Sequence, residues 1–438
     1  MERILEVFLF SAVFLFAICL IYFHTRKNKF TGTYAAVIFS CILYYLIVPA
    51  VLRFSENANE KNKAIYQIVN ANTEQIVCAL LCVLLFMIFS FFGYAHSNSN
   101  ATRLRDAYSA EKLERFCKIA TWVTFLVGGI AFAVYISAFG GLGSLLGVAE
   151  QLRSSGSSAA QYISYTASLM IVPARLITIT PVFCLVLVSR TRRSAPIYFL
   201  IFLCSLLLSA VFYLVNAGKT GILLFALSFS VPVLYKVSKH PWMIALTIAF
   251  ACIPLLGVLD SLFYYFKSGV WRTVDTQASS YLGQFAYPFS NVLNRDGILE
   301  ISGLRWGRDF VTTFLNRLPG VNFDASTVST SFFYSGEKWK VWGGTPNDII
   351  TFGYLQLSYL GVAFLGSALG AVCGKLDRIL SQIESKFALN VIRVTLMTSF
   401  FSMTVNADPN AILMNQIPLW STAICVLYAE KRRKQMDG

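Results

Sequence analysis

The chain has 438 residues, of which 56% are hydrophobic and 13% are charged, whereas about 25% of residues are charged in a typical soluble domain. This composition excludes a soluble globular enzyme, a disordered chain and a fibrous repeat. The net charge of +14 does not indicate nucleic acid binding, because the basic residues stand in short clusters between apolar runs, as they do in membrane proteins. Apolar runs of about 20 residues can each cross the hydrocarbon core, so we predict an all-α polytopic integral membrane protein.

Eleven membrane-spanning helices are predicted from the apolar runs. They lie at about 4–23, 33–52, 76–95, 119–139, 166–188, 197–215, 221–235, 242–260, 349–374, 387–406 and 411–429. Residues 1–260 would form an N-terminal bundle of eight spans, residues 261–348 one long loop, and residues 349–438 three further spans with a basic tail. Because the count is odd, the two termini are expected on opposite sides of the membrane.

The Lys and Arg residues orient these spans. Connections on one side hold 20 of the 36 basic residues, the short connections on the other side hold 6, the long loop holds 8, and 2 lie within spans. Because basic residues accumulate in short cytoplasmic connections, the first side is predicted to be cytoplasmic. The N-terminus and the long loop are then outside, and the C-terminus is inside.

Two outer segments are predicted to carry short amphipathic helices. The connection at 140–165 places Leu145, Leu146 and Leu152 on one helical face, as in a helix at the membrane interface. In the long loop, residues 308–318 carry an apolar stripe and end at a Pro-Gly pair that stops the helix. Lying flat on the outer surface, this second helix would hold Arg308 and Asp309 over the mouth of the helix bundle.

Two cations stand out in or near the predicted spans. Arg175 lies roughly 14 Å from the outer end of span five at the rise of an α-helix, a depth at which Arg marks a functional site or a buried ion pair. Lys219 lies in a turn of small residues at 216–221, where accessible backbone N–H groups at a helix start suit an anion. A plain interfacial turn fits that sequence equally well.

The long loop combines basic and acidic residues with four of the seven Trp residues of the chain. Arg can bind phosphate with two hydrogen bonds, aromatic faces suit sugar rings, and carboxylates can act as general bases. The alternative is a solvated loop with Trp anchors at the bilayer interface. His24, His96 and His240 all fall in predicted cytoplasmic connections, so an outer site has no His base and no His metal ligand.

Three motifs give the chain a family resemblance: the turn at 216–221, the segment at 303–310 with Leu-Pro-Gly at 318–320, and the Gly-rich segment at 343–354 followed by Gly361. Together with many spans and one long outer loop in the second half, these motifs resemble the O-antigen polymerase (Wzy) family of bacterial inner membranes. The motifs cover about 30 residues of the 438, while the similarity in layout extends over nearly the whole chain.

The resemblance implies a metal-independent glycosyltransferase of the GT-C type that needs no cofactor. It would act on the periplasmic face of the bacterial inner membrane and join undecaprenyl-diphosphate-linked oligosaccharide units into O-antigen or a related surface polysaccharide. Its partners would be the lipid-linked donor and acceptor, the lipid bilayer and, as the family suggests, a chain-length regulator protein, but no nucleic acid.

The resemblance and the chemistry together give the expected site. The diphosphate of the donor would be stabilised by cations, and the acceptor hydroxyl would need a carboxylate base. The expected diphosphate ligands are Arg153, Arg175, Lys219, Arg305 and Arg308. The expected base is Asp309, followed by Asp348. The expected sugar-stacking residues are Trp306 and Trp342, and no metal site is expected.

Three other functions are alternatives to that of a polymerase. An O-antigen ligase shares the layout but is expected to use a His in the long outer loop, where this chain has none. A flippase or transporter for lipid-linked sugars would need charges in many spans, whereas Arg175 and Arg393 are the charges predicted within them. A membrane O-acyltransferase is disfavoured, because no His lies in or beside an outer or mid-membrane site.

Overall fold

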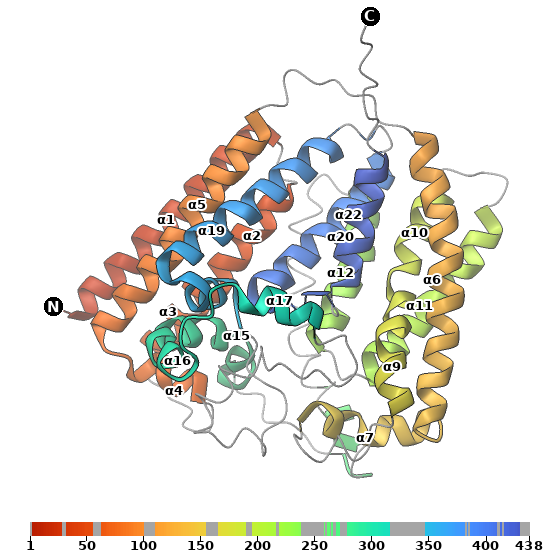
Figure 1. Ribbon diagram of the computed structural model, residues 1–438, viewed down its shortest axis with the longest axis horizontal. Coiled ribbons are helices and arrows are strands. Elements are labelled where there is room, and N and C mark those ends of the chain that lie inside the picture. The colour runs from red at the N-terminus through yellow and green to blue at the C-terminus, as the bar shows by residue number, and fades with distance from the viewer. Residues whose placement is uncertain are drawn as a thin grey trace, which may run out of the picture. The chain divides into compact units, whose positions relative to one another are not determined.

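The computed structural model describes residues 2–28, 32–55, 63–99, 110–154, 165–189, 195–215, 219–237, 278–315, 347–381, 386–409 and 416–429, with short pieces at 258, 261–262, 264–265, 269–271, 383 and 412–413. Within these ranges the regular elements are helices, and no strand occurs (Figure 1). Eight of the described helices are long and apolar enough to cross a membrane. The prediction of an all-α polytopic membrane protein is therefore confirmed.

The eight candidate spans match eight of the eleven predicted ones. They are formed by α1 (Glu2–Asn28), α2 with η1 and α3 (Thr33–Cys41, Ile42–Ile47, Val48–Phe54), α5 (Thr73–Ser99), α6 (Ala110–Ala138), α9 with η3 and α10 (Tyr165–Ala174, Arg175–Thr178, Thr180–Val188), α11 (Ala195–Val215), α19 (Ile349–Leu380) and α20 (Lys386–Val405). Two shorter apolar helices, within α12 (Lys219–Val237) and α22 (Ile417–Ala429), coincide with predicted spans seven and eleven. The predicted span at 242–260 lies almost entirely outside the described residues, so the count of eleven remains a prediction.

The chain divides into two compact units. Unit 1 comprises Met1–Ala101, Thr276–Asp377 and Phe400–Met414, and unit 2 comprises Thr102–Asp275, Arg378–Ser399 and Asn415–Gly438. Each unit therefore combines segments from both halves of the sequence, and each is described by itself below.

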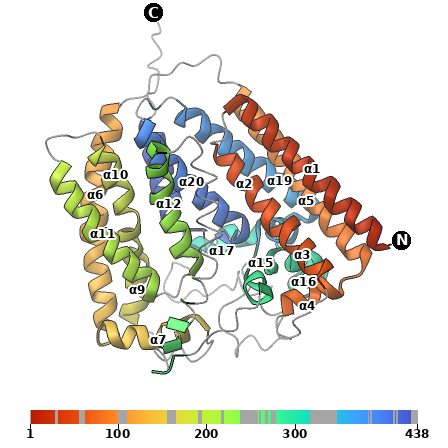
Figure 2. The ribbon, with the colours of Figure 1, turned by 180° about the vertical axis from the view of Figure 1, so that it is seen from behind.

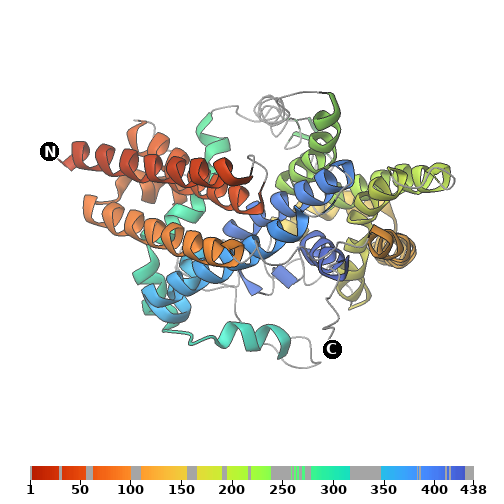
Figure 3. The ribbon, with the colours of Figure 1, turned by 90° about the horizontal axis from the view of Figure 1, so that it is seen from above.

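In unit 1, α1 and α5 run side by side (Figure 3). The helix α15 (Ala278–Leu293) packs on α3, α4 (Lys63–Asn70) and α5, and leads into α16 (Arg295–Ser302) and α17 (Arg308–Leu315). Segments from the predicted long outer loop thus form part of the packed structure of this unit.

A buried ion pair ties α1 to α3 at one end of unit 1. The Arg53 guanidinium donates hydrogen bonds from Nε and Nη2 to the two carboxylate oxygens of Glu6, at 2.9 and 3.0 Å. The Thr73 hydroxyl at the start of α5 donates to Glu6 Oε1 at 2.8 Å. Glu6 is fully buried, and a buried carboxylate is stable only when it is paired and hydrogen-bonded in this way.

The helices α5 and α19 approach with their backbones in contact. Gly366, Gly370 and Gly374 recur at every fourth residue of α19 and therefore line one face of the helix. A Cβ on Gly366 would lie 2.8 Å from the Phe86 carbonyl oxygen, and one on Gly374 would lie 2.8 Å from that of Tyr94. This is the small-residue packing by which membrane helices approach closely.

The helix α19 is interrupted near its start. Leu357 (φ −145°, ψ 31°) and Ser358 (φ 54°, ψ −143°) are not helical. A Cβ on Gly353 would lie 3.0 Å from the carbonyl carbon and oxygen of Gly361, although eight residues of straight helix would separate the two by about 12 Å. The short piece before the break therefore folds back against the long piece after it.

In unit 2, α6 packs along α9, α10 and α22, and α10 packs on α11 (Figure 2). The predicted interfacial helix is present as α7 (Leu142–Ser154). It follows Gly140 and Gly141, which have positive φ values of 80° and 114°, and Leu145 is buried among residues of α6, α9 and α11.

Candidate functional site

A loop at residues 303–307 docks on the break in α19. The backbone N–H of Arg305 donates to the Leu355 carbonyl at 2.9 Å, and that of Trp306 donates to the Gln356 carbonyl at 3.0 Å. Because the break removes the N–H groups that would bond these carbonyls in a continuous helix, the loop supplies the missing donors. The loop reaches this conformation through positive φ values at Gly303, Trp306 and Gly307 (63°, 49° and 76°).

The docked loop places an Arg, a carboxylate and an amide together. Arg305 donates from Nε to Asp309 Oδ2 and from Nη2 to Oδ1, both at 2.5 Å. Gln356 Nε2 donates to Asp309 Oδ2 at 2.7 Å, while its Oε1 accepts the backbone N–H of Gly307 at 3.1 Å. Asp309 also lies in the first turn of α17, where the helix dipole favours a negative charge. We call Arg305, Asp309 and Gln356 the loop cluster.

The side chains beside the loop cluster face outward. Trp306 is 72% exposed and Arg308 is also exposed, so both are accessible from the surface of the unit. Trp342, the other predicted sugar-stacking residue, lies outside the described residues. Of the predicted site residues, four therefore lie together in the structure: Arg305, Trp306, Arg308 and Asp309.

The orientation of α17 differs from the prediction. The helix is present over Arg308–Leu315, and residues 316–318 lie outside the described ranges. The side chains of Phe310 and Val311 are 41% and 59% exposed, whereas Asp309 and Thr313 are each 2% exposed. The expectation that Asp309 lies over an open mouth is therefore corrected, because its hydrogen bonds to Arg305 and Gln356 hold it inside the unit.

Asp348, the second predicted base, directly precedes α19. Its Oδ1 accepts the backbone N–H groups of Ile350 and Thr351, each at 3.1 Å, which is the geometry of a helix N-cap. The Tyr45 hydroxyl also donates to Oδ1 at 2.8 Å. Asp348 is fully buried, and this burial raises the pKa of its carboxyl above the ordinary value despite the hydrogen bonds.

The three remaining predicted cations belong to unit 2. Arg175 lies where span five is interrupted, at the passage from α9 to the 3₁₀ turn η3, two residues after Pro173. Tyr135 and Tyr213 are its electrostatic neighbours. The backbone of Arg153 lies in α7 and that of Lys219 begins α12, but their side chains lie outside the described structure.

One cation that sequence reasoning did not single out is buried in unit 1. Arg295 is 4% exposed, its Nη2 pairs with Asp296 Oδ2 at 3.2 Å, and its Nη1 donates to the Val292 carbonyl at 3.1 Å. Its guanidinium lies 5.4 Å from the ring centroid of Tyr354, within the range of a cation–π interaction. This burial was not predictable from the sequence, because Tyr354 is far from Arg295 along the chain.

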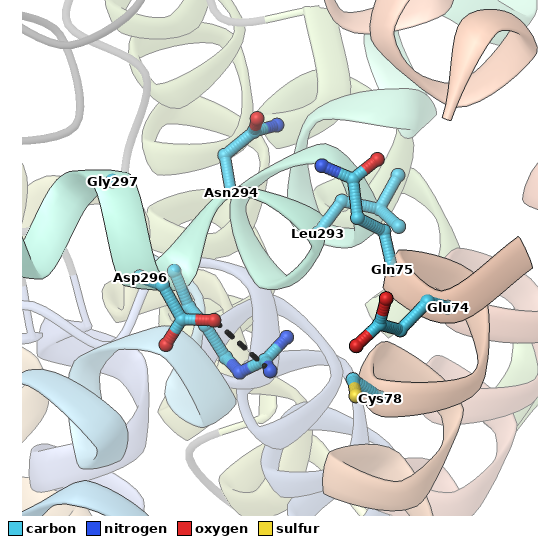
Figure 4. A pocket seen from close by; sticks show the side chains of 8 residues that line it. Glu74, Gln75, Cys78, Leu293, Asn294, Asp296 and Gly297 are labelled. Atoms are coloured by element: carbon cyan, nitrogen blue, oxygen red, sulfur yellow. Dashed lines mark ion pairs between the residues drawn. The ribbon is translucent and has the colours of Figure 1, made fainter. Parts of the chain in front are cut away.

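Arg295 lines a cavity of about 330 Å³. The other lining residues are Glu74, Gln75, Cys78, Leu293, Asn294, Asp296 and Gly297 (Figure 4). The side chains of Glu74 and Gln75 extend from α5 toward the segment that carries Asp296 (Figure 4). We call this the α5–α16 pocket.

No group of three or more His, Cys, Asp or Glu side chains that could hold a metal ion occurs among the described residues. A comparison of the chain with family models, with curated proteins and with solved structures finds no match.

Proposed function

We propose that the chain is a membrane glycosyltransferase that polymerises oligosaccharide units carried on a polyprenyl diphosphate. The observation that supports this most is the loop cluster with its exposed neighbours Trp306 and Arg308. A cation able to bind phosphate, an aromatic ring able to stack on a sugar and a carboxylate here lie within one short segment. The same segment carries part of the sequence resemblance to O-antigen polymerases.

The proposed reaction transfers the growing chain to a new unit. An acceptor hydroxyl oxygen forms the new bond to the anomeric carbon of the donor sugar, and the bond from that carbon to the diphosphate oxygen breaks. The lipid diphosphate leaves with the electron pair, and the acceptor proton passes to a carboxylate. Arginines near the departing oxygen lower the barrier, because they stabilise the negative charge that develops there.

Arg308 and Arg305 are the proposed diphosphate ligands in unit 1. Arg308 is exposed, whereas Arg305 is held by Asp309. In the proposed sequence of events, the incoming diphosphate draws Arg305 away, and Asp309 then becomes able to accept the acceptor proton as a general base must. Trp306 stacks on a sugar ring. Asp348 is the less suitable base, because its Oδ1 accepts the backbone N–H groups of Ile350 and Thr351 that begin α19.

Arg153, Arg175 and Lys219, which belong to unit 2, remain proposed diphosphate ligands, and Trp342 remains a proposed stacking residue. The proposal also includes eleven spans in a GT-C-like arrangement and a location in a bacterial inner membrane. The N-terminus and the loop cluster would face the periplasm, and the C-terminus would face the cytoplasm, as the distribution of basic residues indicates.

Loss of the gene in its native cells distinguishes this function from its rivals. A polymerase mutant is expected to add single repeat units to its lipopolysaccharide, because flipping and ligation of the units continue. Loss of a flippase or of a ligase would leave no repeat units. Gel separation of the extracted lipopolysaccharide measures the difference, and complete absence of repeat units in the mutant would refute the polymerase assignment.

A further inference from the structure

The helix α17 has its polar side inside and an apolar side outside. Asp309, Thr312 and Thr313 are 2%, 4% and 2% exposed, whereas Phe310 and Val311 are 41% and 59% exposed. A helix that borders water shows the opposite arrangement, so the surroundings on the outer side of α17 are expected to be apolar. We call the exposed apolar side chains the apolar face of α17, which comprises Phe310, Val311 and Leu315.

Hydrogen bonds within unit 1 hold α17 in this orientation. Asp309 accepts from Arg305 and Gln356 in the loop cluster, and the hydroxyls of Thr312 and Thr313 donate to the Asp309 carbonyl at 3.3 and 2.7 Å. A rotation of the helix that buried its apolar face would break the bonds of the Asp309 carboxylate. Since a buried carboxylate is costly without such partners, the apolar face is fixed outward.

The length of α19 places α17 at a boundary of the membrane. The piece of α19 after the break, residues 359–380, is roughly 33 Å long at the rise of an α-helix, which is enough to cross a hydrocarbon core of about 30 Å. The basic residues Lys375 and Arg378 lie toward its far end, so the break lies near the opposite boundary of the core. The loop before α17 is bonded to the Leu355 and Gln356 carbonyls at this break.

The apolar face of α17 is adjacent to a span whose own side chains face outward. The rings of Phe310 and Phe352 of α19 meet with their centroids 5.5 Å apart, and α17 lies beside the beginning of α19 (Figure 1). Beyond the break, Leu360 and Phe364 share one side of α19 and are 78% and 65% exposed. Exposed apolar side chains of this size within a membrane span face lipid, so lipid reaches the helix on which α17 is docked.

The groups next to the apolar face suit the same surroundings. Arg308 is exposed at the start of α17, and Trp306 is 72% exposed in the loop before it. Arg binds phosphate groups through charge-assisted hydrogen bonds, and Trp is enriched at the level of the lipid headgroups. The diphosphate and the first sugar of a lipid-linked substrate would lie at that level too, so these residues keep their proposed roles.

We propose that the apolar face of α17 inserts into the lipid bilayer, at the boundary between the headgroups and the acyl chains. Amphipathic helices bind there with their apolar sides about 5–10 Å deep. The partner is therefore membrane phospholipid, in the leaflet that the distribution of basic residues assigns to the outer side. The inference does not rest on the proposed reaction, because burial, hydrogen bonding and helix length carry it.

The test places a photoreactive side chain at Val311 of the full-length protein in nanodiscs of phosphatidylethanolamine and phosphatidylglycerol. Trifluoromethyldiazirinyl-phenylalanine replaces Val311, loses N₂ on irradiation and leaves a carbene that inserts into a C–H or O–H bond of its neighbour. Mass spectrometry of the digested protein identifies the adduct. We expect adducts with phospholipid acyl chains to exceed water adducts several-fold, because an inserted face is surrounded by acyl C–H bonds.

The matched control carries the same photoreactive residue at Asn70, an exposed residue of α4 in the connection between two candidate spans, where water adducts should dominate. The same residue at Leu360 gives the reference for a position within a span. A ratio of lipid to water adducts at Val311 equal to that at Asn70 would overturn the proposal. Adducts with the same chain or with a second copy would also overturn it, because protein would then cover the face.

Leu315 is the second position for the probe if the Val311 variant does not fold. The result is independent of the polymerase assignment. Lipid adducts at Val311 in a protein that forms no polymer would refute the enzyme and leave the membrane contact in place. Water adducts at Val311 in a protein that polymerises lipid-linked units would refute only the membrane contact.

Discussion

Arg308→Ala is expected to abolish long polysaccharide chains while the amount of protein in the membrane stays normal. Arg308 is exposed, so its removal leaves the packed interior of unit 1 intact. Loss of one group that stabilises charge in a transition state lowers a rate by roughly 100- to 1,000-fold. Gel electrophoresis of the polysaccharide, with immunoblots of the protein, measures both outcomes.

Two further variants sharpen this experiment. Arg308→Lys keeps the charge but loses the planar pair of donors, and we expect it to retain part of the chain length. Lys118→Ala removes a half-exposed cation that pairs with Glu114 one turn away on α6 at 2.7 Å and should leave the chains unchanged. Normal chain length in Arg308→Ala at normal protein levels would contradict a role for this residue.

Gly370→Leu is expected to destabilise the protein strongly. A Cβ on Gly370 would collide with the Ser90 carbonyl oxygen of α5, and the backbones of two packed helices cannot shift cheaply. Overpacking in a well-packed interior costs about 1–3 kcal/mol or more. We expect a lower midpoint of thermal unfolding in detergent and a smaller amount of folded protein in the membrane.

The control for this variant is Gly129→Leu on α6. Among the described residues, no atom outside the neighbouring residues and backbone of α6 itself lies within 4 Å of a Cβ built on Gly129, and Leu favours a helix over Gly by up to about 1 kcal/mol. Gly129→Leu should therefore unfold at the wild-type temperature or slightly above it. Equal unfolding midpoints for the two Leu variants would show that α5 and α19 do not pack in the manner described.

The membrane character and most spans were predictable because burial in lipid demands long apolar runs. The break in α19 was not predictable. Leu357 and Ser358 are residue types that also occur in continuous helices. The break leaves the Leu355 and Gln356 carbonyls without helical donors, and the backbone N–H groups of Arg305 and Trp306, which are far away in the sequence, bond to them. The glycines at every fourth position of α19 are a signal of close helix packing that is visible in the sequence.

The site was predictable in its residue types and less so in its geometry. The resemblance and the chemistry singled out Arg305, Trp306, Arg308 and Asp309, which lie together. The burial of Asp309 could not be foreseen, because it depends on Gln356 from α19. The apolar stripe of α17 predicted that Asp309 lies on the accessible side of this helix. A helical pattern alone does not show whether an apolar face meets protein or lipid.

Incubation of the purified full-length protein with a synthetic repeat unit linked to undecaprenyl diphosphate tests the proposed polymerase activity most directly. We predict a ladder of products that differ by one repeat unit, release of free undecaprenyl diphosphate, and an unchanged rate in the presence of EDTA. Recovery of the starting unit alone, from protein that is folded and supplied with its lipid, would contradict the proposed polymerase.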